Sequence, residues 1–326
     1  MWVTSSLETV LIPTAIALGN FDGVHCGHQR VIEPVLALSH ATVVTFYPHP
    51  QEFFTGQKRT LLTPLEEKVE YLRSLGVEQL VMLPFDELLA ALSPEEFVEK
   101  ILVQRLKAQK ISVGQDFHFG RQRMGTATDL QAIAAKYNIA VNIVSLQTCG
   151  GERISSSSIR EALLAGDLST ANQLLGRNYS LTGKVVVGQK LARTLSFPTA
   201  NLELPPEKFL PKHGVYGVRV AIAAKSPAQN TILEHPPTPL IGIMNIGTRP
   251  TVDGTRITIE VHILNWSGDL YGQTLTASLE KFLRPERKFA SLEDLKAQIQ
   301  ADVDLWEGIG NREQVFITHY QETTKT

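Results

Sequence analysis

Short apolar runs alternate with helical patterns through the first half of the chain. The runs cover residues 16–18, 41–46, 79–83, 110–113 and 141–144. Buried strands of a parallel sheet have this continuous apolar character. Thr63 and Ser93 are typical capping residues and open two of the intervening helices. Strands that alternate with helices through short connections predict a parallel sheet with helices on both faces.

The pattern changes after Gly176, where short alternating runs are separated by turns rich in proline and glycine. These runs cover residues 181–187, 214–220, 240–244 and 258–263. They predict an antiparallel barrel or sandwich, and the amphipathic segment from Ser291 to Trp306 predicts one long helix against it. We therefore expect a first domain at 1–178, a second domain at 179–312 and a polar tail at 313–326, with an exposed loop at 225–239.

The composition of the chain argues against nucleic acid and membranes as binding partners. The 326 residues carry a net charge of −2, so no basic surface for nucleic acid is indicated. No run of about 18 apolar residues and no signal-like start appear, which predicts no membrane partner. Two cysteines offer no disulfide framework and fit a reducing compartment. We expect a cytoplasmic protein, and a homo-oligomer is compatible with the sequence.

The stretch from Leu18 to His28 links a predicted strand to a predicted helix. It contains three glycines: Gly19, Gly23 and Gly27. Backbone N–H groups at such a helix start face a phosphate, and glycine lets the chain approach a nucleotide closely. His25 and His28 share one face if the first helical turn begins there. Two imidazoles beside a triphosphate can offset the charge that builds as pyrophosphate leaves.

Two simpler interpretations of this stretch exist. His25, Cys26 and His28 offer ligands for zinc, but Cys149 is far away in sequence, so a closed structural site lacks partners. A plain turn with surface histidines is the other interpretation. The strand, glycine turn and helix in sequence favour the phosphate site.

Other polar and aromatic residues follow the predicted strands, at the end where ligands bind in open α/β sheets. His49 lies between two prolines and is either a substrate contact or structural. Asp116 can accept hydrogen bonds, and Phe117 and Phe119 can stack on a flat ring or pack the domain.

Four serines and an arginine lie between residues 155 and 160. Ser158 and Glu161 have the spacing of a capping box, which predicts a helix start at Ser158. One serine would suffice for a cap. The additional hydroxyl groups and Arg160 therefore suit a bound polyphosphate.

The second half has its own candidate site. Thr199 and Asn201 point to the same side of an extended chain, and two neutral oxygen ligands at that spacing suit Mg²⁺ carrying nucleotide phosphates. The preceding loop Gly188–Arg193 is short and flexible enough to close over phosphates. Glu260 faces away from the barrel core, as either a solvated carboxylate or the general base of phosphoryl transfer.

The motif formed by His25, Gly27 and His28 resembles the H-x-G-H signature of class I nucleotidyltransferases. The whole chain is similar to the prokaryotic bifunctional riboflavin kinase/FMN adenylyltransferase family. The matching stretches are Gly19–His28, Tyr47–Pro50, Gly114–Gly120, Ile154–Arg160, Leu175–Arg177, Phe197–Asn201, Gly214–Tyr216, Asn245–Gly247, Arg249–Thr251, Glu260, Gly268–Gly272 and Leu283–Glu286.

The resemblance implies a Rossmann-like nucleotidyltransferase domain that adenylylates FMN to FAD and releases pyrophosphate. His25 and His28 would stabilise the leaving phosphates, and Ser157 and Arg160 would hold the triphosphate. The other implied nucleotide contacts are Gly19, Phe21, Gly23, Gly27 and Ser158. The implied flavin contacts are His49, Asp116, Phe117 and Phe119.

For the second domain the resemblance implies a six-stranded antiparallel barrel with a long C-terminal helix, which phosphorylates riboflavin with ATP and Mg²⁺ and leaves ADP. Thr199 and Asn201 would ligate the metal, and Glu260 would take the hydroxyl proton. The implied nucleotide contacts also include Gly188, Lys190 and Arg193. The implied flavin contacts are Tyr216, Asn245, Arg284 and Glu286.

The kinase loop of the family commonly has glycines where this chain has Ala192 and Ser196, and Tyr47 replaces an expected acid. A Cβ at the two loop positions would restrict closure if the backbone needs a positive φ. Two alternatives therefore remain beside the bifunctional enzyme. One is a barrel that binds flavin without turnover, as a sensor. The other is an adenylyltransferase for another phosphate substrate, such as phosphopantetheine, against which the barrel with Thr199, Asn201 and Glu260 argues.

Overall fold

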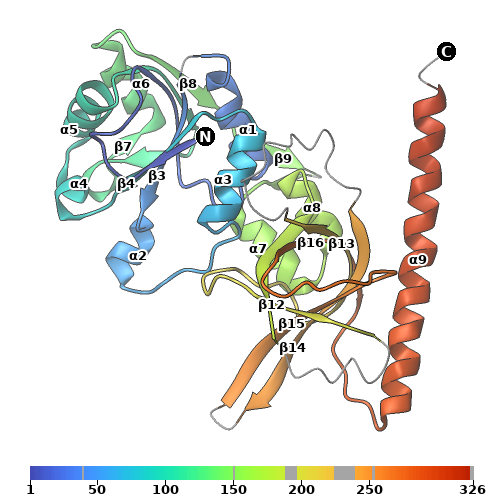
Figure 1. Cartoon of the computed structure of the whole chain (residues 1–326). Helices are drawn as coiled ribbons and strands as arrows, with labels where there is room; N and C mark the ends of the chain where they lie inside the picture. Colours follow the sequence, from blue (N-terminus) through green and yellow to red (C-terminus); the bar gives the residue numbers. More distant parts are fainter. Residues whose placement is uncertain (39, 150, 188–196, 224–238, 252–253, 324–326) are drawn as a thin grey trace. The chain divides into compact units, whose positions relative to one another are not determined.

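The computed structural model describes residues 1–38, 40–149, 151–187, 197–223, 239–251 and 254–323 (Figure 1). The chain forms two compact units. Unit 1 comprises Met1–Arg160, Gln173–Gly176 and Glu207–Phe209, and unit 2 comprises Glu161–Asn172, Arg177–Pro206 and Leu210–Thr326. Several expected features lie outside the described residues, namely Gly188, Lys190, Ala192, Arg193, Ser196 and nearly all of the 225–239 loop.

Unit 1 is built on a six-stranded sheet in which every neighbouring pair is parallel. In sequence order the strands are β1 (Trp2–Thr4), β2 (Thr14–Leu18), β3 (Ala41–Tyr47), β4 (Gln79–Pro84), β5 (Ala108–Gly114) and β8 (Ala140–Val144). Their order in the sheet is β1-β4-β3-β2-β5-β8. The prediction of an α/β domain is confirmed. The edge strand β1 was missing from the prediction because three residues are too short for a periodic pattern.

Helices and one small hairpin connect these strands, and a second hairpin and two helices follow β8. The helices are α1 (Cys26–Ile32), α2 (Pro50–Thr55), α3 (Leu65–Ser74), α4 (Glu87–Ala91), α5 (Pro94–Glu96), a π-helix (Phe97–Arg105), α6 (Ala127–Ala135), α7 (Ser156–Ala165) and α8 (Leu168–Leu175). Short 3₁₀ segments cover Glu33–Val35 and Arg121–Arg123. The hairpins pair β6 (His118–Phe119) with β7 (Gly125–Thr126), and β9 (Thr148–Cys149) with β10 (Glu152–Arg153).

Two predicted helix starts are wrong in detail. α7 begins at Ser156, and Ser155 caps it by accepting from the backbone N–H of Ser158 at 3.1 Å. The capping function therefore belongs to Ser155, three residues before the predicted Ser158. Thr63 does not cap α3, because its Oγ1 accepts from the N–H of Gly23 at 2.9 Å. The local pattern assigns the Thr63 hydroxyl to the helix, but in the fold this hydroxyl binds Gly23, which is 40 residues away.

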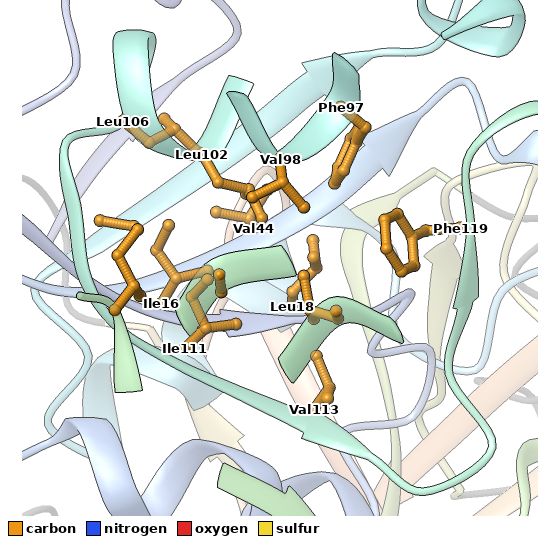
Figure 2. Close-up of a cluster of buried hydrophobic side chains, with 14 of the residues drawn as sticks. Ile16, Leu18, Val44, Phe97, Val98, Leu102, Leu106, Ile111, Val113 and Phe119 are labelled. Atoms are coloured by element: carbon orange, nitrogen blue, oxygen red, sulfur yellow. The ribbon is translucent and has the colours of Figure 1, made fainter. Parts of the chain in front are cut away.

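The sheet of unit 1 is buried on both faces, which explains its continuous apolar strands. Figure 2 shows one face, where Ile16, Leu18 and Val44 pack against the side of the π-helix that carries Val98 and Leu102. Alternate residues of the same strands, such as Ala17 and Val43, face a second cluster under α1 and α3. This packing fixes the carboxyl ends of the strands, from which the candidate site is built.

The core of unit 2 is a closed six-stranded antiparallel barrel. Its strands are β11 (Tyr179–Val186), β12 (Ala200–Glu203), β13 (Gly214–Ile222), β14 (Leu240–Thr251), β15 (Gly254–Ile263) and β16 (Thr274–Arg284). Their order is β11-β12-β15-β14-β13-β16, and β16 closes the barrel by pairing with β11. The barrel is confirmed and the sandwich is excluded.

A long helix, α9 (Leu292–Thr323), packs on the outside of the barrel and is drawn in red in Figure 1. Trp306 and Val303 of α9 contact Val215, Ile243 and Leu264 of the barrel. The predicted C-terminal helix is confirmed, and it extends well past Trp306. Within the part of the chain that the structure describes, no helix has the length and apolar character to cross a membrane.

The contact between α9 and the barrel predicts a large effect of one methyl group. A Cβ added at Gly217 would lie 2.5 Å from Cε3 and 2.8 Å from Cε2 of Trp306, whose ring is fully buried. We expect Gly217→Ala to lower the free energy of unfolding by about 1–3 kcal/mol through overpacking, measured by chemical denaturation. Gly308→Ala is the control, because nothing lies within 4 Å of a Cβ there. An unchanged midpoint for Gly217→Ala would contradict this account of the packing.

Candidate functional site

A cavity of about 730 Å³ opens at the carboxyl ends of the strands of unit 1. Its walls come from the segments that follow β2, β3, β4, β5 and β8. It collects ten of the predicted site residues: Gly19, Phe21, His25, Gly27, His28, His49, Asp116, Phe117, Phe119 and Ser157. Gly23, Ser158 and Arg160 do not line it. Segments far apart in sequence therefore meet at one cavity, as the topology of the sheet requires.

The two histidines of the H-x-G-H motif form one stacked pair. His25 is the N-cap of α1, and its Nδ1 accepts from the backbone N–H of His28 at 3.2 Å. The two rings are 3.6 Å apart at an interplanar angle of 15°. A Cβ at Gly27 would lie 3.2 Å from Nδ1 of His25, so the glycine makes room for the first ring. The motif thus provides a helix cap at His25, a residue without a side chain at Gly27 and a ring at His28 that stacks on His25.

The glycine turn is strained at residues other than its glycines. Phe21 and Val24 have φ values of 49° and 41°, which side chains with a Cβ adopt rarely. Of the three glycines only Gly23 lies in the left-handed region, with φ of 88°. Each strained residue costs about 1–3 kcal/mol and persists only where packing enforces it. Both Phe21 and Val24 are buried, and this packing holds the turn in one shape before a ligand arrives.

Asp22 organises the base of the site, and sequence reasoning missed it. Its carboxylate forms a largely buried ion pair with Arg160 and also accepts from the backbone N–H of Leu62 at 2.9 Å. Ser156 Oγ donates to the carbonyl of Asp22 at 2.8 Å. The guanidinium of Arg160 donates in addition to the carbonyl of Thr60 at 3.1 Å. Arg160 is therefore bound to the glycine turn in this structure.

The serines take different positions. Ser157 lines the cavity at the N-terminal turn of α7, where its hydroxyl and the backbone N–H groups can meet phosphate oxygens. Ser158 Oγ contacts Ser155 Oγ at 2.8 Å and donates to the carbonyl of Arg153. Ser158 thus supports the turn, while Ser157 faces the space that a ligand would occupy.

Aromatic rings line another part of the cavity. Phe54 and Phe85 pack edge to face with centroids 5.8 Å apart, and Phe46 contacts Phe85 in the same way at 5.7 Å. Phe117 stacks on Phe119 at 5.8 Å and 11°, but Phe119 is itself part of the core in Figure 2. These flat apolar surfaces suit a planar ring system.

Asp116 is also placed at this cavity, in an ion pair with Arg153. Both side chains remain about half exposed, so the pair contributes little to stability and can exchange partners with a charged ligand. Asp116 also lies close to Gly114, where a Cβ would sit 3.1 Å from its Oδ1.

His49 begins α2 and is neutral at physiological pH. Its Nδ1 accepts from the N–H of Gln51 at 3.1 Å, and burial with the nearby Arg59 cation lowers its pKa to about 4. An imidazole that caps a helix through a lone pair must lack a proton on that nitrogen. The structural and the substrate-contact interpretations of His49 both remain compatible with its place in the cavity wall.

This pKa gives a testable pH dependence. The folded-state pKa lies below the unfolded value of 6.5, so the stabilisation is complete above pH 6.5 and is lost as the pH falls through 4. We expect the His49 ring to titrate near pH 4 in an NMR titration. A His49→Gln variant should lose less stability than the parent between pH 6.5 and pH 4. A midpoint near 6.5 for His49 would contradict the assignment.

The side chains of the H-x-G-H motif are not arranged as zinc ligands in this structure. Cys26 Sγ is directed at the carbonyl of Gln173, 3.6 Å away, and the rings of His25 and His28 stack on each other. Among the residues that the structure describes, no group of three or more His, Cys, Asp or Glu side chains is arranged to hold a metal ion.

The barrel brings three predicted residues into one row. Asn201 of β12 pairs directly with Glu260 of β15, and Glu260 pairs with Asn245 of β14. Side chains of directly opposed residues lie on the same face. Their chain neighbours Ala200, Val261 and Met244 are buried in the barrel, so the row lies on its outer face. Amide and carboxylate oxygens therefore converge beside the segment that carries Thr199.

His262 anchors that segment, a role the sequence did not indicate. Its Nδ1 lies 2.9 Å from the carbonyl of Pro198, and its ring meets Phe197 edge on at 5.4 Å. His262 is two residues beyond Glu260 on the same strand face. It therefore fixes Phe197 and Pro198, and with them the approach of Thr199 to the row.

The other predicted flavin contacts of the barrel are Arg284, Glu286 and Tyr216, and they have different surroundings. Arg284 forms a two-pronged ion pair with the buried Asp302 of α9, at 2.8 and 3.0 Å. Glu286 Oε2 accepts from the N–H of Thr248 at 3.4 Å, beside Asn245. Tyr216, in contrast, is fully buried inside the barrel, where its hydroxyl donates to the carbonyl of Lys212 and burial raises its pKa. The structure does not bring Tyr216 to the row of Asn201, Glu260 and Asn245.

Known protein families match both halves of the chain. A family model described as FAD synthetase matches residues 8–158, and one described as riboflavin kinase matches residues 175–309. A bifunctional riboflavin kinase/FMN adenylyltransferase from Escherichia coli K12 is 40% identical over 88% of this chain and 90% of its own length. The enzyme of that name from Listeria monocytogenes is 36% identical over 89% of this chain and 90% of its own length.

A solved structure is similar as well. The crystal structure of a protein from Streptococcus pneumoniae named as a macrolide-efflux protein has 28% sequence identity and a TM-score of 0.80, covering 94% of this chain and 98% of that one. Both family models, the relatives across most of the chain and the two sets of placed residues agree: this chain belongs to the family of bifunctional riboflavin kinase/FMN adenylyltransferases.

Proposed function

We propose a division of labour in which the cavity of unit 1 adenylylates FMN and the outer barrel face of unit 2 phosphorylates riboflavin. The protein is a transferase with both activities: it converts riboflavin to FMN with ATP and then FMN to FAD with a second ATP. The observation that carries the assignment is the presence of two separate constellations. One is the stacked His25 and His28 pair at a large cavity, and the other is the row containing Asn201 and Glu260.

In unit 1 a phosphate oxygen of FMN attacks the α-phosphorus of ATP. The new P–O bond forms as the bond to the β-phosphate breaks, and pyrophosphate leaves. His25 and His28 lie at the N-terminus of α1, where donors can stabilise the charge that develops on the leaving group. Ser157 and the start of α7 bind the phosphates, and the rings of Phe54, Phe85 and Phe117 accept the flavin.

In unit 2 the 5′-hydroxyl of riboflavin attacks the γ-phosphorus of ATP, and ADP leaves. Glu260 takes the hydroxyl proton as the new P–O bond forms. The oxygens of Thr199 and Asn201 fit Mg²⁺, which prefers oxygen ligands together with substrate phosphates. When bound, the ion would neutralise phosphate charge. Asn245 of the row and the neighbouring Glu286 orient the flavin.

We also propose that the protein acts in the cytoplasm, in line with its two free cysteines, Cys26 and Cys149. Two other functions fit less well. An adenylyltransferase for another phosphate substrate does not need the barrel constellation. A barrel that only senses flavin does not need Glu260 beside Asn201.

The experiment is a timed chromatographic assay with riboflavin, ATP and Mg²⁺ that follows FMN and FAD separately. We expect FMN to appear first and FAD later. FAD formed only when FMN is supplied would mean that Ala192 and Ser196 have cost the barrel its kinase activity. Omitting Mg²⁺ in the presence of a chelator should stop FMN formation.

A further inference from the structure

A short segment from the second half of the chain is part of unit 1. Glu207–Phe209, which we call the strap, pairs with the backbone between α2 and α3. The N–H of Leu61 donates to the carbonyl of Glu207 at 2.6 Å, and the N–H of Phe209 donates to the carbonyl of Leu61 at 2.8 Å. Leu61 and Lys208 form a parallel bridge. The backbone of the strap is thus held to unit 1 by one isolated bridge.

The side chain of Lys208 points into unit 1. Its ammonium donates to the carbonyl of Leu62 at 2.8 Å and forms an ion pair with Glu67 of α3. The lysine side chain is 1% exposed and that of Glu67 10%, so this pair is inside the protein. Burying an ammonium group is costly unless its partners are placed accurately. Lys208 therefore fixes Leu62 relative to α3.

Leu62 connects this pair to the glycine turn. While its carbonyl binds Lys208, its N–H donates to Oδ1 of Asp22. Its Cδ1 lies 3.0 Å from the position of a Cβ on Gly23. The next residue, Thr63, accepts from the N–H of Gly23. The segment of Leu62 and Thr63 is therefore held by Lys208 on one side and by the glycine turn on the other.

The second side chain of the strap reaches Arg160. The guanidinium carbon lies 5.5 Å from the centre of the Phe209 ring, within the range of a cation–π contact. The same guanidinium is paired with Asp22. The two strap side chains therefore reach Asp22 by two routes, through Leu62 and through Arg160.

We propose that Lys208 and Phe209 are positioning residues of the adenylyltransferase site. They act through Asp22 on the turn that carries His25, and through Arg160 on the start of α7 that carries Ser157. Neither lines the cavity, so both would act through their neighbours and not by contact with substrate. A chain segment between Asn201 of the kinase site and the next barrel strand thus sets the geometry for the other reaction. This inference rests on the proposed function of the cavity.

The test measures both reactions in the full-length protein. Lys208→Met removes the ammonium and keeps an unbranched apolar stem, and Phe209→Leu removes the ring. With FMN supplied and ATP varied, we expect kcat/KM for ATP to fall about ten- to a hundredfold in each. FMN formation from riboflavin should stay within about twofold. Lys212→Met is the matched control, because the exposed Lys212 contacts the carbonyl of Ala165 and the ring of Phe282, which both belong to unit 2.

A double variant separates positioning from stability. Lys208→Met with Glu67→Gln leaves no buried carboxylate beside the missing ammonium, so the melting temperature should recover in part. FAD formation that stays low in this variant supports positioning, whereas recovery of FAD formation together with stability overturns it. Full FAD formation by folded Lys208→Met and Phe209→Leu would overturn it as well. A parent protein that cannot convert FMN to FAD would refute the proposed function itself.

Discussion

Replacing His28 with alanine is expected to abolish FAD formation while FMN formation from riboflavin continues. The ring of His28 lies at the cavity, stacked on His25 at the N-terminus of α1. In the proposed reaction this ring would donate to the pyrophosphate as the bond to the α-phosphorus breaks. Loss of one such donor typically lowers kcat by about a hundred- to a thousandfold. The measurement is FAD formation from supplied FMN and ATP, with the riboflavin reaction followed in parallel.

The fold should survive this change. The backbone N–H of His28, and not its ring, is bonded to Nδ1 of His25, so the helix cap is retained in the variant. His213→Ala is a matched control, because His213 belongs to unit 2 and does not line the cavity. If folded His28→Ala lost both activities, the assignment of two separate sites would be wrong. If it kept full FAD formation, the leaving-group role of His28 would be wrong.

Local patterns in the sequence predict most of the strands and the position of the first motif, whereas contacts between distant residues appear only in the fold. Five strands of the sheet and four strands of the barrel were predictable because each is a short pattern of apolar residues that burial requires. The strands β1, β12 and β16 were not among the predicted runs. The juxtaposition of His25 and His28 was predictable because they lie three residues apart at a helix start, whereas the cap and the ring stack were seen only in the structure. Periodicity also placed Glu260 on the outer face of its strand, where the structure has it.

The missing parts are contacts between residues far apart in sequence. Asp22 and Arg160 are 138 residues apart, and Lys208 and Glu67 are 141 residues apart. No local pattern reports such a pair. A lysine in a proline-rich connection also has the usual appearance of a solvated residue. The same reason explains Thr63, which a local pattern assigns to a helix cap and the fold assigns to Gly23.

Glu260→Gln is expected to stop riboflavin phosphorylation and to spare the conversion of supplied FMN to FAD. Glutamine keeps the length of the side chain and its position opposite Asn201 and Asn245. It cannot take the hydroxyl proton. A general base contributes about a hundred- to ten-thousandfold to such a step, so FMN formation should fall by that order at saturating ATP and riboflavin. The measurement is the initial rate of FMN formation.

A neighbouring carboxylate, Glu203, provides the control for Glu260→Gln. Glu203 is exposed on β12, two residues beyond Asn201 and on the same outer face of the barrel. Glu203→Gln removes an equal charge from that face without removing the group opposite Asn201, so it should leave FMN formation near the parental rate. If both variants lost activity equally, riboflavin phosphorylation would depend on the negative charge of this barrel face and not on a proton acceptor at Glu260. If Glu260→Gln kept the parental rate, the base would have to be another group, because glutamine has no lone pair basic enough to accept the proton.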